Sequence, residues 1–160
     1  MNVDYLMRSL MFVPAHNERL MDSATRVDAD VLLLDIEDSV QPLANKQVAR
    51  DNIVKYVSGG RFSGRPVFPR INDRESGQLL KDVTQLTIAG VTGFMYPKAK
   101  KGEDIYFFGK LLETIEFEIA NSDNTDNHVW NCWHCQCGSR TGQSPRYCRH
   151  DKSDCPQGSG

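Results

Sequence analysis

The chain has 160 residues, of which 39% are hydrophobic, and carries a formal net charge of −2 at pH 7. This balance favours one globular domain of ordinary size and argues against a nucleic-acid partner. The opening residues MNVDYLMRSLMFVP lack the apolar core of a secretion signal, and no stretch approaches the ~20 apolar residues of a membrane span. We therefore expect a cytoplasmic protein without a membrane partner.

Strand-like and helix-like stretches alternate from residue 8 to residue 119. The first strand is expected over residues 9–14, and the first helix over 17–25 with Asn17 as its N-cap. The apolar positions of that helix are Leu20, Met21 and Ala24.

The second strand is expected in DVLLLD, residues 30–35. Its unbroken apolar run suits a strand that is covered on both faces, as in parallel sheets. The second helix is expected over residues 45–58, and Gly59-Gly60 would end it. Its apolar stripe consists of Ala49, Ile53 and Val57.

The third strand is expected in RPVFPRIN, residues 65–72, although prolines are unusual inside a strand. The third helix is expected over residues 75–90, and the fourth strand around Phe94 to Tyr96. The third helix would bury Leu80, Val83 and Thr87. The fourth helix would bury Ile105, Phe108, Leu112, Ile115 and Ile119.

Strands and helices that alternate through short links predict an α/β fold with a parallel sheet and right-handed crossovers. The two candidate architectures are a doubly wound sheet and a (β/α) barrel. The segment VPAHNERL lacks the G-x-G-x-x-G pattern, which weakens a dinucleotide-binding interpretation. In both architectures the ligand lies at the C-terminal ends of the strands.

Polar side chains collect after the predicted strands. In chain order these are His16 and Asn17, then Asp35, Glu37 and Asp38, then Arg70 and Asn72, and finally Lys98. Carboxylates beside cations suit an anionic substrate and a divalent metal. Three of them also have an ordinary structural interpretation: Asp38 as a helix cap or loop ion pair, Lys98 as a solvated lysine, and His16 as a capping or surface residue.

Four segments resemble successive blocks of the citrate lyase beta-subunit family, which is grouped with the malyl-CoA lyases and the HpcH/HpaI aldolases. They are RSLMFVPAHNERL, ADVLLLDIEDSVQPLANKQVAR, RPVFPRIN and GFMYPKAKKGEDI. The most specific block is L-D-x-E-D-[SG]-V followed by a helix with K-x-x-A-R. The resemblance runs from Arg8 to Ile119. It implies a (β/α)8 TIM barrel, usually trimeric or hexameric, of which the chain would carry the first four units.

The resemblance implies a magnesium-dependent (Mg2+) carbon–carbon lyase that cleaves a hydroxyacyl-CoA such as citryl-CoA or malyl-CoA. Arg70 matches the arginine that holds the substrate's carboxylate or carbonyl oxygen. Lys98 and Arg19 are further candidate substrate-binding residues, Arg19 for the coenzyme A phosphates. The candidate catalytic residues are Asp35, Glu37 and Asp38, which match the acidic block that supports the metal's water shell and the barrel mouth.

The resemblance places the family's metal ligands beyond the matched region, so no metal ligand is assigned in this chain. Glu113-Thr114 imitates part of a P-L-I-E-T-like ligand motif but falls inside the predicted fourth helix. A complete barrel has roughly 250 residues. We therefore expect residues 1–119 to form a truncated barrel that is inactive as a fragment, with its first and fourth strands as open edges.

Residues 120–160 are expected to form an irregular tail without a strand. This tail contains all the cysteines of the chain, Cys132, Cys135, Cys137, Cys148 and Cys155. A zinc module that includes His150, a disulfide-rich tail and a shifted reading frame are the three explanations, although the odd cysteine count argues against disulfides.

Two other functions stay open. One is an aldolase that acts on a free 2-keto acid, which a test of coenzyme A binding would distinguish. The other is a non-catalytic binding protein with a zinc-bound tail, which stoichiometric zinc would favour.

Overall fold

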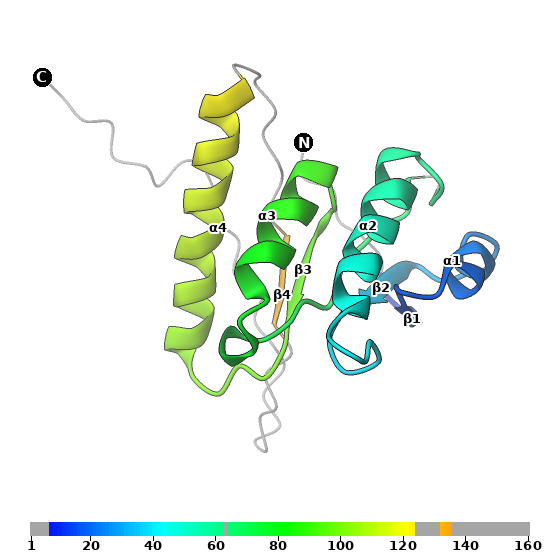
Figure 1. The fold of residues 1–160 in the computed structure, drawn as a ribbon, viewed down its shortest axis with the longest axis horizontal. Coiled ribbons are helices and arrows are strands. Elements are labelled where there is room, and N and C mark those ends of the chain that lie inside the picture. The colour runs from blue at the N-terminus through cyan, green and yellow to red at the C-terminus, as the bar shows by residue number, and fades with distance from the viewer. Residues whose placement is uncertain (1–6, 63, 124–131, 136–160) are drawn as a thin grey trace, which may run out of the picture.

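The computed structural model describes residues 7–62, 64–123 and 132–135 of the chain (Figure 1). Strands and helices alternate along most of it, as the sequence predicts. The elements are β1 (Leu10–Pro14), α1 (Glu18–Ala24), β2 (Val31–Asp35), α2 (Asn45–Ser58), the short 3-10 helix η1 (Arg74–Ser76), α3 (Leu79–Ala89), β3 (Gly93–Tyr96), α4 (Gly102–Asp123) and β4 (Cys132–Cys135). None of the described helices is long and apolar enough to cross a membrane.

The strands form one open parallel arrangement in chain order. β1 pairs with β2, and β3 pairs with β4, both in parallel. The segment 66–71 lies between β2 and β3, because parallel bridges join Val67 to Leu32 and join Arg70 to both Asp35 and Met95. The predicted α/β fold with a parallel sheet is therefore confirmed.

The predicted third strand lies at its expected place in the sheet, but its prolines interrupt the hydrogen bonding. Phe68 and Arg70 donate their backbone N–H groups to Leu32 and Leu34 of β2, each at 2.9 Å. Pro69 has no N–H group to donate toward β3, although its carbonyl oxygen accepts from Met95 at 2.9 Å. The segment therefore forms single bridges instead of a continuous strand.

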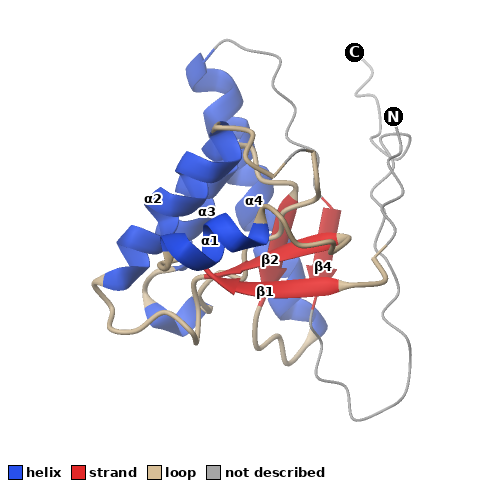
Figure 2. Ribbon diagram, turned by 90° about the vertical axis from the view of Figure 1, so that its right-hand side faces the viewer, coloured by secondary structure: helices blue, strands red, loops and turns tan. Residues whose placement is uncertain are grey.

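The helices pack against one face of the sheet and enclose the main core. Figures 1 and 2 show α2, α3 and α4 side by side along the strands. Successive strand residues point to opposite faces, so β2 contributes Leu32 and Leu34 to this core. A smaller apolar cluster on the opposite face consists of Val31, Leu33, Phe68 and Met95.

The predicted helix faces are confirmed for the most part. Asn17 caps α1, since its side-chain oxygen accepts from the Leu20 backbone N–H at 3.2 Å. Of the three apolar positions of α1, Met21 and Ala24 are buried, whereas Leu20 is 42% exposed. Along α2 and α4 the predicted stripes are buried or partly buried. Their members are Ala49, Ile53 and Val57 on α2, and Ile105, Phe108, Leu112, Ile115 and Ile119 on α4.

The third helix differs from its prediction in two ways. The expected helix over residues 75–90 is broken at Gly77, whose φ of 69° lies in the left-handed region. Helix α3 starts two residues later, at Leu79, which is 6% exposed, whereas the predicted core residue Leu80 is 60% exposed. The predicted burial of Val83 and Thr87 is confirmed.

The prediction that the tail contains no strand is wrong at one place. β4 pairs with β3 from Gly93 opposite Cys132 to Tyr96 opposite Cys135. The fourth predicted strand is therefore not an edge, whereas β1 has a strand neighbour on one side only within the described residues. The remaining residues of the proposed zinc module, Cys148, His150 and Cys155, lie outside the described residues, as does Cys137.

Candidate functional site

The polar residues predicted to follow the strands meet at the C-terminal end of the sheet. Because β2, the segment 66–71 and β3 are parallel, the ends that carry Asp35, Arg70 and Lys98 lie together. Glu37 and Asp38 join them from the loop after β2, and Asp73 joins them from the loop after Arg70. We call these six residues the rim cluster: Asp35, Glu37, Asp38, Arg70, Asp73 and Lys98.

Arg70 and Asp35 form a two-bond ion pair at the centre of the rim cluster. Arg70 Nε donates to Asp35 Oδ1 at 2.8 Å, and Arg70 Nη2 donates to Asp35 Oδ2 at 2.7 Å. Both side chains are shielded, with 18% of Arg70 and 2% of Asp35 exposed. Asp35 also accepts the backbone N–H groups of Glu37 and Ser39, at 2.9 Å and 3.1 Å. It therefore fixes both the guanidinium and the loop after β2.

These contacts keep the Asp35 carboxylate and the Arg70 guanidinium charged. Burial raises the pKa of Asp35, but the hydrogen bonds from Arg70, Ser39 and Glu37 outweigh it, so that this pKa lies below its ordinary value. The hydrogen bond to Asp35 raises the pKa of Arg70. The guanidinium also lies 5.0 Å from the centre of the Phe12 ring, a distance that suits a cation–π contact.

Glu37 bridges the two cations of the rim cluster. Its Oε2 atom lies 3.4 Å from Arg70 Nη1, and its Oε1 atom lies 2.8 Å from Lys98 Nζ. The Glu37 side chain is only 6% exposed. Asp38 lies beside the same two cations but is 65% exposed and more distant, at 3.6 Å from Arg70 and 3.8 Å from Lys98.

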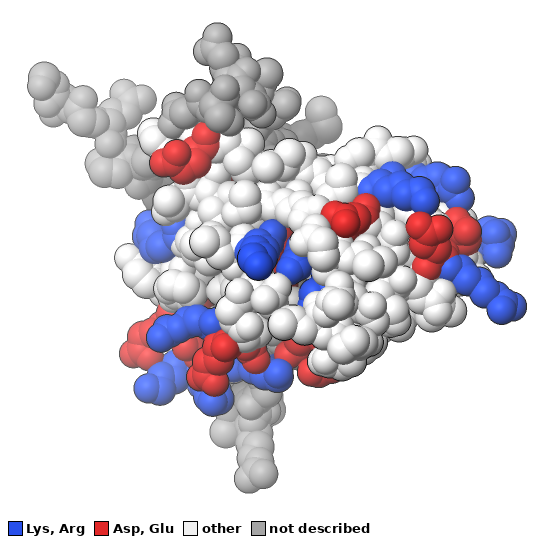
Figure 3. All heavy atoms as spheres, viewed as in Figure 1, with Lys and Arg blue, Asp and Glu red and all other residues white. Residues whose placement is uncertain are grey.

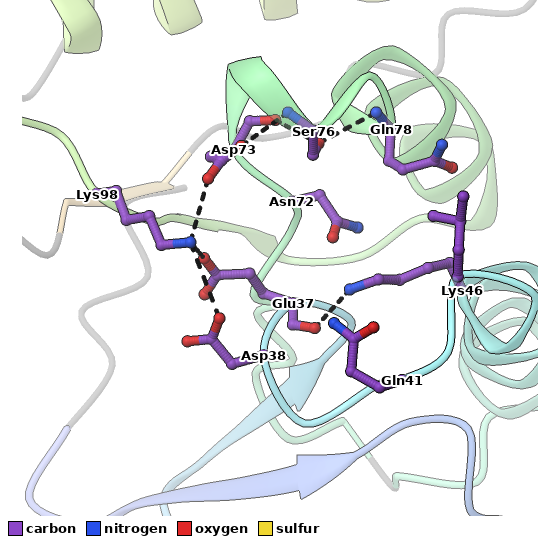
Figure 4. A pocket seen from close by; sticks show the side chains of 10 residues that line it. Glu37, Asp38, Gln41, Lys46, Asn72, Asp73, Ser76, Gln78 and Lys98 are labelled. Carbon is purple, nitrogen blue, oxygen red and sulfur yellow. Dashed lines mark hydrogen bonds and ion pairs between the residues drawn. The ribbon is translucent and has the colours of Figure 1, made fainter.

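Lys98 faces three carboxylates from an uncommon backbone conformation. Figure 4 shows its ammonium group pointing toward Glu37, Asp38 and Asp73, with Asp73 Oδ2 at 3.2 Å. The hydrogen bonds to Glu37 and Asp73 raise the pKa of Lys98. Its φ of 56° lies in the left-handed region, which a non-glycine residue adopts at a cost of roughly 1–2 kcal/mol. The ion pairs at the rim help to offset this cost.

Lys46 holds the backbone of the loop that carries Glu37. The sequence analysis did not identify it as a site residue. Its ammonium group donates to the backbone carbonyls of Ile36 and Glu37, and the residue is 5% exposed. Burial lowers the pKa of Lys46, against the opposing attraction of nearby carboxylates that include Asp82. The available signal was its position as the lysine of the K-x-x-A-R block.

A second buried network lies beneath Asn72. The Asp82 Oδ2 atom accepts from the backbone and side-chain nitrogens of Asn72, at 2.8 Å and 2.7 Å. Arg50 Nε lies 3.3 Å from Asp82 Oδ1, and Arg50 Nη2 donates to Gln78 at 2.7 Å. Burial raises the pKa of Asp82, although the hydrogen bonds from Asn72 oppose this rise. Asn72 is therefore held in the interior by Asp82, next to Asp73 in the chain.

Two cavities, each of about 220 Å³, flank the rim cluster. The first is polar, and its lining includes the carboxylates of Glu37, Asp38 and Asp73, the ammonium groups of Lys46 and Lys98, and the amides of Gln41, Asn72 and Gln78 (Figure 4). The second lies against the Arg70–Asp35 pair, with Phe12, Pro14 and Ser39. Figure 3 shows charges of both signs interspersed at the end of the molecule where α4 begins, so that this face carries no single-sign field.

Two predicted site residues lie apart from the rim cluster. Arg19 is exposed on α1, and no described contact joins it to the cluster. His16 is partly buried, and its Nδ1 atom has no hydrogen-bond partner within the described residues.

The carboxylates of the rim cluster do not fit a magnesium site. Asp35 already accepts four hydrogen bonds, while Glu37 and Asp38 face two cations. Within the described part of the chain, no group of three histidine, cysteine or acidic residues could hold a metal ion. Glu113 lies in α4 and pairs with Lys110 at 2.6 Å.

A solved structure shares the fold. The malate synthase of Haloferax volcanii, solved as a lead(II) complex, superposes with a TM-score of 0.63 at 20% sequence identity. The superposition covers 74% of this chain and 38% of that enzyme. At this identity the likeness concerns the fold alone.

Two curated relatives align with most of this chain. The citrate lyase subunit beta of Leuconostoc mesenteroides subsp. cremoris is 26% identical over 125 residues, which is 78% of this chain and 41% of that protein. The L-malyl-CoA/beta-methylmalyl-CoA lyase of Cereibacter sphaeroides is 32% identical over 112 residues, which is 68% of this chain and 35% of that protein. The chain thus spans about two fifths or less of these relatives.

A family model extends over the strands and loops that form the rim cluster. The model described as HpcH/HpaI aldolase/citrate lyase matches residues 8–130. The matched region contains all four sequence blocks and confirms the predicted resemblance. The chain therefore belongs to the HpcH/HpaI aldolase/citrate lyase family.

Proposed function

We propose that this chain supplies the first strand–helix units of a (β/α)8-barrel lyase that cleaves a carbon–carbon bond in a hydroxyacyl-CoA. The observation that carries the proposal is the Arg70–Asp35 pair, held beside Lys98 at the C-terminal ends of parallel strands. The activities for which the relatives are named, those of a citrate lyase subunit and a malyl-CoA lyase, support this substrate class. The cytoplasmic location and a trimeric or hexameric assembly stay predictions.

Arg70 and Lys98 would stabilise the negative charge that develops during cleavage. A base takes the hydroxyl proton, the hydroxyl oxygen forms a carbonyl as the carbon–carbon bond breaks, and the electron pair of that bond moves onto the thioester carbonyl to give an enolate. Since Asp35 holds Nε and Nη2 of Arg70, its Nη1 atom is the donor left to face a substrate oxygen. One such fixed donor stabilises the transition state by about 3 kcal/mol.

The three candidate catalytic carboxylates would have different roles. Asp35 is buried, accepts four hydrogen bonds and has a lowered pKa, so it suits the positioning of Arg70 better than proton transfer. Asp38 is exposed beside both cations and is the accessible proton acceptor. Magnesium enters this proposal through the family resemblance alone, and no step above depends on it.

The test is calorimetric binding of malyl-CoA and citryl-CoA to the purified chain with Mg2+, beside free malate and oxaloacetate. We expect acyl-CoA binding that Arg70→Lys weakens roughly tenfold, because a lysine cannot keep both bonds to Asp35. The matched control is Arg26→Lys, at an exposed arginine outside the rim cluster.

Other outcomes favour the other functions. Tighter binding of the free acid favours an aldolase, and stoichiometric zinc without binding of either ligand favours a binding protein. We expect no turnover from the 160-residue chain alone, because the resemblance places the metal ligands beyond the matched blocks. Magnesium-dependent cleavage by this chain would contradict that placement.

A further inference from the structure

The carboxylate of Glu37 occupies the space between the two cations of the rim cluster. We propose that this space is a carboxylate-binding position and that Glu37 is its internal competitor, which an acidic ligand must displace. The inference rests on the proposed function in taking the ligand to be a carboxylic acid. Beyond the substrate-binding role already proposed for Arg70 and Lys98, it adds a selective role for Glu37.

The geometry of Glu37 defines what the position accepts. One carboxylate oxygen faces Arg70 Nη1 at 3.4 Å and the other faces Lys98 Nζ at 2.8 Å. A planar group with two oxygens and one negative charge therefore spans the two cations. A ligand carboxylate has the same shape and charge, so it could bind there only in place of Glu37.

The neighbouring acids cannot play this part. Asp35 is fixed by four hydrogen bonds, so its departure would release Arg70 and the loop after β2. Asp38 is 65% exposed and lies more than 3.5 Å from either cation, at 3.6 Å and 3.8 Å. An exposed ion pair at such distances contributes little. Glu37 is the only one of these three that is both buried and free of a second set of side-chain hydrogen bonds among the described residues.

Glu37 can move without disturbing the loop that carries it. Lys46 holds its backbone carbonyl, and Asp35 holds its backbone N–H. The side chain borders the polar cavity of about 220 Å³, which the amides of Gln41 and Gln78 also line. A rotation into this cavity would exchange the cations for amide donors (Figure 4). A ligand's apparent affinity is then its intrinsic affinity multiplied by the fraction of time that Glu37 is rotated away from the cations.

The experiment titrates sodium malonate and sodium acetate into the full 160-residue chain, followed by NMR at constant ionic strength. We expect Glu37→Gln to bind malonate roughly tenfold more tightly than the unchanged chain, because a neutral amide competes poorly for two cations. Asp38→Asn removes the same charge next to the position and should change the affinity less than about twofold. Lys98→Met should cancel the gain when added to Glu37→Gln.

A second measurement does not depend on how well any variant folds. In the unchanged chain, saturating malonate should shift the carboxyl carbon signal of Glu37 more than that of Asp38. The proposal is overturned if Glu37→Gln binds malonate no better, if Asp38→Asn gains as much, or if the gain survives Lys98→Met. Malonate lacks coenzyme A, so these outcomes are separate from acyl-CoA binding, on which the proposed function is judged.

Discussion

Arg70 is held by Asp35 in an orientation that leaves one nitrogen for other partners. Two of its nitrogens bind Asp35, and the third faces Glu37 and Asp38. A buried pair of this kind contributes modestly to net stability, but the loss of one partner leaves the other charge uncompensated. The consequence is that Asp35 acts on any ligand through the position of Arg70.

Replacement of Asp35 by asparagine should destabilise the fold in a pH-dependent way. The folded pKa of Asp35 lies below its ordinary value of 3.8, so folding favours the ionised form. Its contribution is complete above that value and is lost as the pH falls through the folded pKa. We expect Asp35→Asn to lower the free energy of unfolding by about 3 kcal/mol at pH 7 and by less at pH 3.

Urea unfolding at both pH values measures this difference. The control is Asp38→Asn, whose exposed carboxylate should contribute less than about 1 kcal/mol at either pH. An equal loss for Asp35→Asn at pH 7 and pH 3 would show that its ionisation does not stabilise the fold.

The presence of five of the six rim-cluster residues at one end of the sheet could be predicted, because the strand ends of a parallel sheet converge. The ion pairs among them could not be predicted, because residue spacing does not fix side-chain rotamers. Asn72 follows the third strand, but its side chain turns inward to Asp82. In the sequence, Asp82 looks like any solvent-exposed acidic residue of a helix, so this contact could not be predicted. Lys46 likewise has a long side chain whose burial depends on the loop above it.

At the scale of elements, α3 shows where apolar patterns are ambiguous. The segment LLKDVTQLTIAG contains apolar residues at helical spacing from either Leu79 or Leu80. Only the neighbouring helices decide which face is buried, and the break at Gly77 sets where α3 begins. The prolines of the third strand could be recognised in the sequence, but the sequence did not show that Pro69 accepts a bond from Met95.

Two adjacent leucines give a matched test of the α3 face. Leu79→Ala should lower the free energy of unfolding by about 2–4 kcal/mol, because the side chain is 6% exposed and would leave a cavity. Leu80→Ala should change it by less than about 0.5 kcal/mol, since Leu80 is 60% exposed. Thermal and urea unfolding measure both variants. A larger loss of stability for Leu80→Ala than for Leu79→Ala would mean that α3 is rotated so that Leu80 faces the core.

At the scale of the whole molecule, the sheet is open. Within residues 7–62, 64–123 and 132–135, its edge strands β1 and β4 each have a strand neighbour on one side only. Leu10 and Phe12 of β1 are 40% and 46% exposed. An apolar strand with an unpaired edge is a template for association with another chain.

We therefore expect the 160-residue chain to self-associate through β1. Leu10→Lys should reduce this association, because a charge on an edge strand opposes pairing with a second apolar strand. Light scattering coupled to size exclusion, over a range of concentrations, measures the effect. Ile88→Lys is the matched control, since Ile88 is 65% exposed but lies on α3. If Ile88→Lys reduces association as strongly, general charge repulsion explains the effect, and a chain that stays monomeric throughout contradicts the prediction.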